Sequence, residues 1–256
     1  MSESTLRIGV LLPEVLGTYG DTGNAIVLRE RAKARGIDAE LVDIDLDTAI
    51  PTDIDIYTMG GGEDVAQALA AEKFRTDPGL SSSLERGVPL LAICASLQVL
   101  GHWYRDAFGE RVDGLGVLDV TTDPQGFRSI GELLTEPVLD GLTVPLTGFE
   151  NHGGGTVLGP DARPLGRVVA GTGNGTPEGT EPPAEGEAYD GVVQGSIIAT
   201  YMHGPVLARN PELADLLLRR ATGRETLEPL EVAGVARLRE ERLAAARSGD
   251  ADGHLH

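Results

Sequence analysis

Apolar and polar positions follow two different periods along the first hundred residues. Short continuous apolar runs, typical of buried strands, alternate with segments whose apolar residues recur at helical spacing. The expected strands are residues 6–12, 39–42, 54–59 and 89–93, and the expected helices are 25–36, 65–74, 80–86 and one that starts after residue 94. Strands that alternate with helices in this way predict a doubly wound, mostly parallel sheet.

The pattern changes after Tyr104 to short β-like segments that are split by Gly, Pro and Asp. These segments are expected at 112–120, 130–134, 144–147 and 166–170, followed by a hairpin at 190–193 and 196–202 that turns at 194–195. Residues 172–187 have no apolar period and are expected to form a mobile surface loop. Helical patterns over 207–221 and 227–247 follow.

We therefore expect an α/β fold in which a parallel sheet is followed by a β-rich half and C-terminal helices. Residues 6–221 should form one domain, 222–247 a helical extension and 248–256 a disordered tail. No internal repeat marks a boundary between independent domains.

Composition narrows the class of function. The 256 residues are 41% hydrophobic, which is enough for a sizeable core, and the formal net charge of −19 argues against nonspecific binding to nucleic acid or an anionic membrane. The single cysteine excludes an internal disulfide and suits a reducing compartment. Neither a signal peptide nor a membrane-spanning run is visible, so we expect a cytoplasmic protein that does not insert into membranes.

Cys94 stands where the apolar run 89–93 changes to a helical pattern. A thiol at a strand-to-helix turn lies at a helix N-terminus, where the macrodipole and free N–H groups favour the thiolate. This is the arrangement of a nucleophile elbow. The alternative is an inert cysteine in the core.

A catalytic thiol needs a base within hydrogen-bond reach. His203 directly follows an expected strand and is the best candidate, while His152, in a loop, is the second. His102 should lie on the same helix as Cys94, about 12 Å along its axis, which is too far for contact. The two histidines of the C-terminal tail are poor candidates.

The triple glycine at residues 60–62 follows an expected strand and exposes backbone N–H groups. The pattern of a phosphate-binding loop is absent, so we expect no nucleoside-triphosphate site in this chain. We expect the N–H groups of Ala95, Gly61 and Gly62 to stabilise an oxyanion instead. The residues alone then predict acyl transfer through a thioester, and they leave amidase, peptidase and thioesterase open.

Residues 89–98 resemble the nucleophile motif of class I, triad-type glutamine amidotransferases, and residues 59–62 resemble their oxyanion strand. Typical members carry His-x-Glu, whereas Pro205 stands two residues after His203. The cobyric acid synthase-like branch shares this lack of an acid, and residues 148–152 are also similar to that branch. The resemblance covers residues 6–221 and implies a flavodoxin-like amidotransferase domain.

Three further motifs, at residues 19–24, 126–128 and 201–205, resemble the glutaminase subunits of lipid II isoglutaminyl synthases. The resemblance implies that Cys94 attacks the side-chain amide of L-glutamine, and that His203 acts as base and then as acid. It implies that Arg128 holds the substrate α-carboxylate. Gln98 and His152 are expected to shape the glutamine pocket. One departure is Ser96, which stands where the family has glycine.

Released ammonia is useful only beside an activated acceptor, and this chain shows no ATP site. We therefore expect a separate synthetase chain that carries ATP and Mg. The resemblance implies a heterodimer with a MurT-like Mur-ligase subunit, which activates the D-glutamate of lipid II for amidation to D-isoglutamine in peptidoglycan synthesis. On this hypothesis the partner also supplies the missing acid in trans.

Three alternatives remain open. The chain could serve another amidation, such as that of cobyric acid, although those enzymes carry the synthetase on the same chain. It could be a non-catalytic binding protein of the same fold, although both Cys94 and His203 are present. It could also be a cysteine peptidase, which would need no partner.

Overall fold

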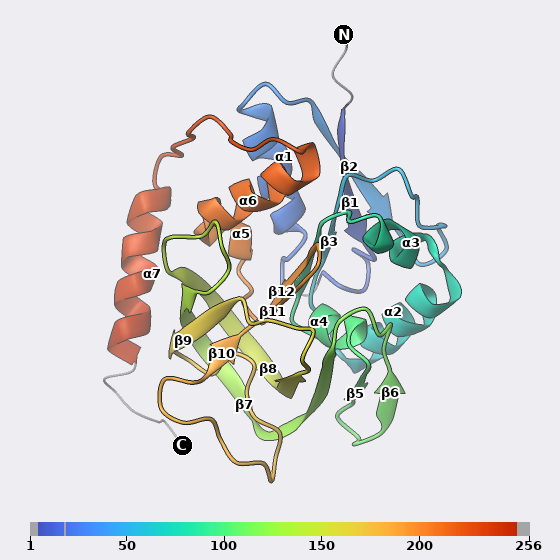
Figure 1. The fold of residues 1–256 in the computed structure, drawn as a ribbon, viewed down its shortest axis with the longest axis vertical. Coiled ribbons are helices and arrows are strands. Elements are labelled where there is room, and N and C mark those ends of the chain that lie inside the picture. The colour runs from blue at the N-terminus through green and yellow to red at the C-terminus, as the bar shows by residue number, and fades with distance from the viewer. Residues whose placement is uncertain (1–4, 18, 250–256) are drawn as a thin grey trace.

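A six-stranded sheet forms the centre of the molecule, in a computed structural model that describes residues 5–17 and 19–249 (Figure 1). Its order is β11-β12-β4-β3-β1-β2, and all neighbours are parallel except β11, which pairs antiparallel with β12. The strands are β1 (Leu6–Leu11), β2 (Ala39–Ile44), β3 (Ile56–Met59), β4 (Leu90–Ile93), β11 (Val192–Gln194) and β12 (Ile197–Thr200). The mostly parallel sheet confirms the predicted fold class.

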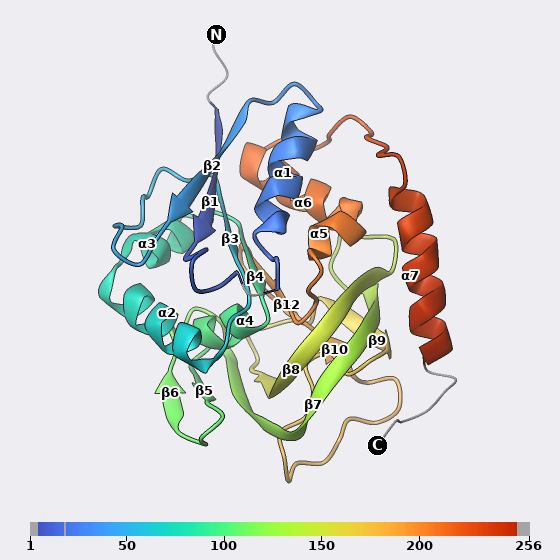
Figure 2. The ribbon, with the colours of Figure 1, turned by 180° about the vertical axis from the view of Figure 1, so that it is seen from behind.

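Helices cover both faces of this sheet, as the views from the two sides show (Figures 1 and 2). They are α1 (Gly23–Lys33), α2 (Asp64–Thr76), α3 (Gly79–Glu85), α4 (Ala95–Leu100), α5 (Val206–Arg209), α6 (Pro211–Thr222) and α7 (Val235–Gly249). Every residue of β3, β4 and β12 is buried, which explains why these strands read as continuous apolar runs. Within the described ranges, no helix is both long and apolar enough to cross a membrane.

A second sheet packs beside the first and has the order β10-β9-β7-β5-β6, with β8 paired to β7. Its strands are β5 (Trp103–Arg105), β6 (Arg111–Asp113), β7 (Val120–Pro137), β8 (Leu146–Leu158), β9 (Gly166–Ala170) and β10 (Tyr189–Asp190). The short segment expected at 166–170 is confirmed as β9. The expectation was wrong for 112–120, where only the end of β6 and the start of β7 form strand, for 130–134, because β7 is continuous over 18 residues, and for 144–147, because β8 continues to Leu158. The Pro and Gly that seemed to end β7 lie at an irregularity between Pro124 and Ser129, where the register with β8 shifts.

Three helical predictions also need correction. The helix expected over 207–221 is two helices, because Pro211 cannot continue a helix and pushes Asn210 out of the helical region. The last helix is α7, which starts eight residues after the expected start at Leu227 and continues to Gly249. The expected disordered tail therefore begins within this helix, and residues 250–256 lie outside the described residues. Likewise α4 ends at Leu100, so His102 follows the helix rather than lying on it.

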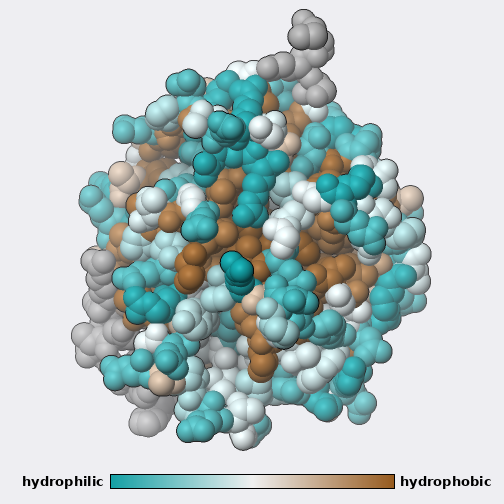
Figure 3. Space-filling model, viewed as in Figure 1, coloured by the Kyte–Doolittle hydropathy of each residue, from teal (hydrophilic) through white to brown (hydrophobic). Residues whose placement is uncertain are grey.

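The carboxyl ends of β1, β3, β4 and β12 meet at one edge of the central sheet. The loop before α1, the triple glycine, Cys94 and His203 directly follow these four strand ends or lie close beyond them. Open α/β sheets bind their ligands at this edge. Seen from the side of Figure 1, the surface is largely hydrophilic, with hydrophobic side chains gathered near its centre (Figure 3).

Candidate active site

Cys94 occupies a strained turn between β4 and α4. Its backbone has φ 53° and ψ −108°, a combination that side-chain-bearing residues rarely adopt. The Cys94 N–H donates to Thr200 O at 2.8 Å, which fixes the turn to β12. The residue is 7% exposed and lines a pocket, as a nucleophile elbow requires.

Ser96 stands two residues after Cys94, where the resemblance implies glycine. Its side chain is fully buried, and its hydroxyl donates to Gly60 O. Gly60 in turn packs so closely that an added Cβ would lie 1.9 Å from Leu16 O. The serine therefore ties the elbow to the triple-glycine loop rather than disturbing it.

His203 lies three residues beyond β12, and its backbone is held by an antiparallel bridge to Phe149. Its imidazole is buried, with Nδ1 2.9 Å from Asp21 Oδ2. The Nε2 atom is buried without a hydrogen bond in the described part of the chain. Burial alone would lower the pKa of His203, but the hydrogen bond to Asp21 and the electrostatic interactions with Asp21 and the nearby Cys94 raise it to about 10. The imidazole is therefore protonated at neutral pH.

Asp21 is the residue that the sequence analysis missed. It comes just before α1, a position where aspartate often caps a helix, yet the N-cap is Thr22 and no side-chain hydrogen bond caps this helix. The Asp21 carboxylate is instead fully buried beneath His203. The hypothesis was that a partner supplies the acid. In this structure a carboxylate of the chain itself, Asp21, lies beside His203. A signal was available, since the loop that holds Asp21 leaves β1 at the same sheet edge as Cys94.

The triple-glycine loop lies between the acid, the base and the thiol. An added Cβ on Gly61 would lie 2.7 Å from His203 Cε1 and 3.5 Å from Cys94 Cβ. The Gly61 N–H donates to Asp21 Oδ2 at 2.9 Å, so this donor is not free for an oxyanion as expected. Gly62 lines the pocket, and Ala95 begins α4, where N–H groups have no partner within the helix. These two residues remain as candidate oxyanion donors.

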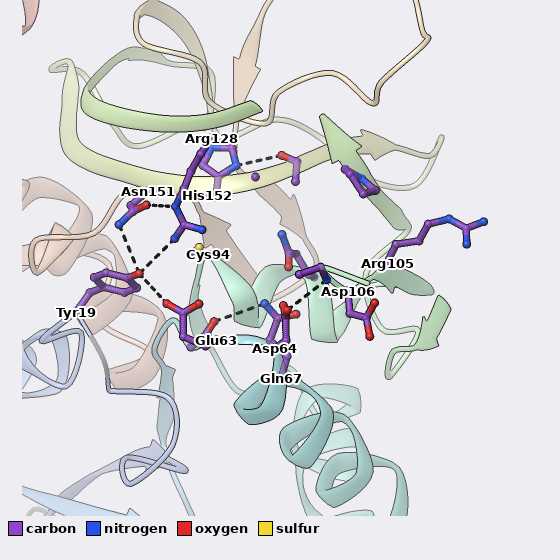
Figure 4. A pocket seen from close by; sticks show the side chains of 16 residues that line it. Tyr19, Glu63, Asp64, Gln67, Cys94, Arg105, Asp106, Arg128, Asn151 and His152 are labelled. Atoms are coloured by element: carbon purple, nitrogen blue, oxygen red, sulfur yellow. Dashed lines mark hydrogen bonds between the residues drawn. The ribbon is translucent and has the colours of Figure 1, made fainter. Parts of the chain in front are cut away.

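The pocket at Cys94 has a volume of about 160 Å³ and brings together side chains of the second sheet with those of loops and helices at the edge of the central sheet (Figure 4). Predicted residues Arg128, Gln98 and His152 all line it, together with Tyr19, Glu63, Asp64, Gln67, Arg105, Asp106 and Asn151. Arg128 Nε donates to Asn151 Oδ1 at 2.6 Å, and its NH2 group lies 3.5 Å from Tyr19 OH. These acceptors are neutral, so the positive charge of Arg128 remains available to an anionic ligand.

An acidic group faces the same pocket across Tyr19. The Tyr19 hydroxyl donates to Glu63 Oε1 at 3.0 Å, and Figure 4 shows these side chains directed toward Arg128. Burial and the hydrogen bond to Glu63 raise the pKa of Tyr19, which keeps this hydroxyl protonated. A cationic and an anionic side chain thus lie on either side of one tyrosine, as recognition of a zwitterionic amino acid requires.

Gln98 and His152 belong to a buried network on the inner wall of the pocket. Gln98 Nε2 donates to Tyr201 OH at 3.1 Å, and the His152 ring stacks on Tyr201 with centroids 3.9 Å apart. His152 Nδ1 lies 3.0 Å from Gly154 O. His152 Nε2 lies 3.7 Å from Glu150 Oε2, which is beyond hydrogen-bond distance, whereas His203 Nδ1 lies 2.9 Å from Asp21 Oδ2. The hydrogen-bonded acid–base pair is therefore at His203, and His152 lies in the pocket wall.

One other prediction concerns a histidine outside this cluster. His102 lies outside the pocket, is about half exposed and pairs with Asp119 at 3.0 Å. Among the described residues, no group of three or more His, Cys, Asp or Glu side chains could hold a metal ion.

Comparisons with known proteins agree with this geometry. Residues 7–211 match the CobB/CobQ-like glutamine amidotransferase domain. The chain is 35% identical to subunit GatD of the glutamine-hydrolyzing lipid II isoglutaminyl synthase of Staphylococcus aureus (strain N315), over 95% of this chain and 96% of that protein. It is 33% identical to subunit GatD from Streptococcus pneumoniae (strain ATCC BAA-255 / R6), over 84% and 80% of the two chains.

More distant relatives share parts of the chain or the fold. A cobyric acid synthase from Pelotomaculum thermopropionicum is 35% identical over 56% of this chain, but over only 28% of its own length. A crystal structure of a glutamine amidotransferase has a TM-score of 0.52 at 21% identity, covering 84% of this chain and 98% of the other. The family match and the GatD relatives show that the chain belongs to the CobB/CobQ-like glutamine amidotransferases and is an enzyme of that class.

Proposed function

We propose that this chain is the glutaminase subunit of a lipid II isoglutaminyl synthase. The observation that carries the proposal is the meeting of Cys94, His203 and Asp21 beside a pocket with separated charges. The chain also matches a lipid II isoglutaminyl synthase subunit over nearly the full length of both proteins, whereas it matches only a part of cobyric acid synthases.

In the proposed reaction, glutamine lies with its α-carboxylate on Arg128 and its α-ammonium toward Glu63. This arrangement directs the side-chain amide at Cys94. A bidentate carboxylate pair with Arg128 would be a charge-assisted interaction that also fixes orientation. Glu63 discriminates against ligands that lack an amino group, because such a ligand would leave the Glu63 carboxylate without a positive partner.

Cys94 Sγ then attacks the amide carbon, and the amide oxygen becomes an oxyanion that accepts hydrogen bonds from the N–H groups of Ala95 and Gly62. The His203 imidazolium gives its proton to the amide nitrogen, the C–N bond breaks, and ammonia leaves. The product is a γ-glutamyl thioester on Cys94. A water molecule attacks this thioester while His203 takes its proton, the C–S bond breaks, and glutamate leaves. The Cys94 thiolate and the His203 imidazolium are thereby restored.

The ammonia would serve a Mur-ligase-like partner that binds ATP and Mg and activates the D-glutamate carboxylate of the lipid II stem peptide. Amidation of that carboxylate gives D-isoglutamine. We place this heterodimer in the cytoplasm, where ATP is supplied. The phosphorylation step belongs to the partner, and this chain contributes only the nitrogen.

The proposal is tested first by reaction with the glutamine-analogue electrophile 6-diazo-5-oxo-L-norleucine. We expect one adduct, on Cys94, and protection by L-glutamine. Arg128→Ala should slow labelling, while iodoacetamide, which needs no carboxylate recognition, should still react. A chain that iodoacetamide modifies but the analogue does not would favour a binding protein without glutaminase activity. Cleavage of peptides without a partner would favour a peptidase.

A further inference from the structure

Asp21 makes a set of contacts that no helix cap or surface carboxylate would make. It precedes α1 and is separated by 182 positions from His203, yet its Oδ2 atom lies 2.9 Å from His203 Nδ1. The same oxygen accepts the Gly61 N–H at 2.9 Å. The other oxygen, Oδ1, is buried without a partner in the described part of the chain. One carboxylate oxygen therefore joins the base to the triple-glycine loop.

Burial of the Asp21 carboxylate costs free energy unless a positive charge lies close enough to compensate it. The Asp21 side chain is 0% exposed, and an isolated carboxylate in such a place loses several kcal/mol of hydration. The titratable groups that face the imidazole are Asp21 and Tyr19 from the loop before α1, and Cys94 from the elbow. Among the described residues, the imidazolium of His203 is the one positive group in contact with Asp21, and the Gly61 N–H, from which Asp21 also accepts, is neutral.

We propose that Asp21 is the positioning acid of this glutaminase centre, and that its single shared oxygen fixes both the His203 imidazole and the triple-glycine loop. The bond at Nδ1 directs Nε2 to the thiol and the substrate amide. The bond from Gly61 holds that peptide away from the pocket, so the next peptide, Gly62, presents its N–H to the oxyanion. This inference rests on the proposed function for the reaction, but it places the third residue within this chain rather than on the partner.

Asp21→Asn is the sharpest variant, because an amide oxygen can still accept both hydrogen bonds while the negative charge is lost. Its NH₂ group would take the place of the unpartnered Oδ1. Loss of an adjacent opposite charge should lower the pKa of His203 by about 1–3 units. The kcat for glutamine hydrolysis should fall at least about 100-fold with KM changed less than about threefold, as expected of a residue that does not touch substrate.

The experiment uses the full-length chain without a partner. The His203 pKa is followed by NMR of ¹⁵N-labelled histidine in the wild-type protein, Asp21→Asn and Asp190→Asn. Asp190 is the matched control, since it is also fully buried and binds Thr200 and the Tyr201 N–H rather than His203. We expect a strongly raised His203 pKa in the wild-type protein and in Asp190→Asn, and a lowered one in Asp21→Asn.

A wild-type pKa near the ordinary value of about 6.5, or equal shifts in the two variants, would overturn the proposal. The wild-type titration decides this point even if Asp21→Asn does not fold. Glutaminase activity is measured in parallel with the same proteins. Should the wild-type chain bind no glutamine and show no analogue labelling while the His203 pKa is still raised by Asp21, the proposed function fails and the positioning role stands.

Discussion

The strained backbone at Cys94 should make a change from alanine to glycine less destabilising there than at an ordinary buried position. Replacing alanine by glycine at a buried strand or helix position costs about 1–2 kcal/mol, because a methyl group leaves the core and the unfolded chain gains freedom. At Cys94, φ 53° and ψ −108° fall where only glycine is free of strain. A side-chain-bearing residue held in such a region costs about 1–3 kcal/mol. That strain should be present in Cys94→Ala and absent from Cys94→Gly.

The change from alanine to glycine should therefore be about 1–3 kcal/mol less costly at position 94 than at an unstrained site nearby. Ala92 provides that site, since it is also fully buried and lies on the adjoining strand β4 without a positive φ. For a chain of this length, 1 kcal/mol corresponds to about 2–4 °C in Tm.

Urea unfolding followed by circular dichroism gives the four free energies that are needed. The first difference compares Cys94→Gly with Cys94→Ala, and the second compares Ala92→Gly with the wild-type protein. If the change from alanine to glycine costs the same free energy at positions 94 and 92, the turn at Cys94 stores no strain. The reasoning would then be refuted, because the surrounding fold would not be holding Cys94 in an unfavourable conformation. Neither Cys94 variant should retain glutaminase activity.

The other predictions concern the base, the substrate anchor and the buried carboxylate of the core. Gly61→Ala would place a Cβ 2.7 Å from His203 Cε1, so the imidazole must move by several tenths of an ångström. In an ammonia-release assay, kcat/KM should therefore fall about 10–100-fold. Gly131→Ala is the control, because it has open space around it and should keep full activity. Arg128→Ala should raise KM for glutamine about 10–100-fold with little change in kcat. The KM of Arg128→Lys should lie between those of the wild-type protein and Arg128→Ala, because an ammonium group cannot form the bidentate pair. A lowered kcat at unchanged KM would refute this role. Burial raises the pKa of Asp190 to about 6 in the folded protein, so the folded state binds the proton more tightly than the unfolded state and stability should fall as pH rises from about 4 to 6. In urea unfolding, the free energy of unfolding should decrease by about 2–3 kcal/mol less between pH 4 and pH 7 in Asp190→Asn than in the wild-type protein. The same pH dependence in both proteins would contradict this.

The sequence predicted best what is encoded locally. Cys94 and His203 each follow a continuous apolar run, and such runs are buried strands whose ends meet at one sheet edge. The hairpin turn was predicted to within one residue: it was expected at 194–195 and lies at Gly195–Ser196, where Gly195 has φ 58°. These features depend only on burial and turn chemistry over a few neighbouring positions.

The features that were missed depend on contacts between distant segments. An Asp before a helix predicts a cap, and the position of its loop at the sheet edge of Cys94 indicates only that Asp21 lies near the site. No neighbouring residue indicates that its oxygen accepts from a glycine 40 positions away and from a more distant histidine. The length of β7 was missed because Pro124 is compatible with a strand only where the partner strand shifts register. In each case the tertiary partner decided between two local possibilities.

The most direct test of the central claim follows nitrogen from glutamine to lipid II. The full-length chain is combined with its Mur-ligase-like ATP-dependent partner, lipid II, ATP, Mg and glutamine labelled with ¹⁵N at the side-chain amide, and the stem peptide is examined by mass spectrometry. The account predicts that the label enters the D-isoglutamine amide, that Cys94→Ala abolishes this transfer, and that free ammonium restores amidation in that variant. Transfer of the label by Cys94→Ala, or amidation whose nitrogen does not come from glutamine in the wild-type complex, would contradict it.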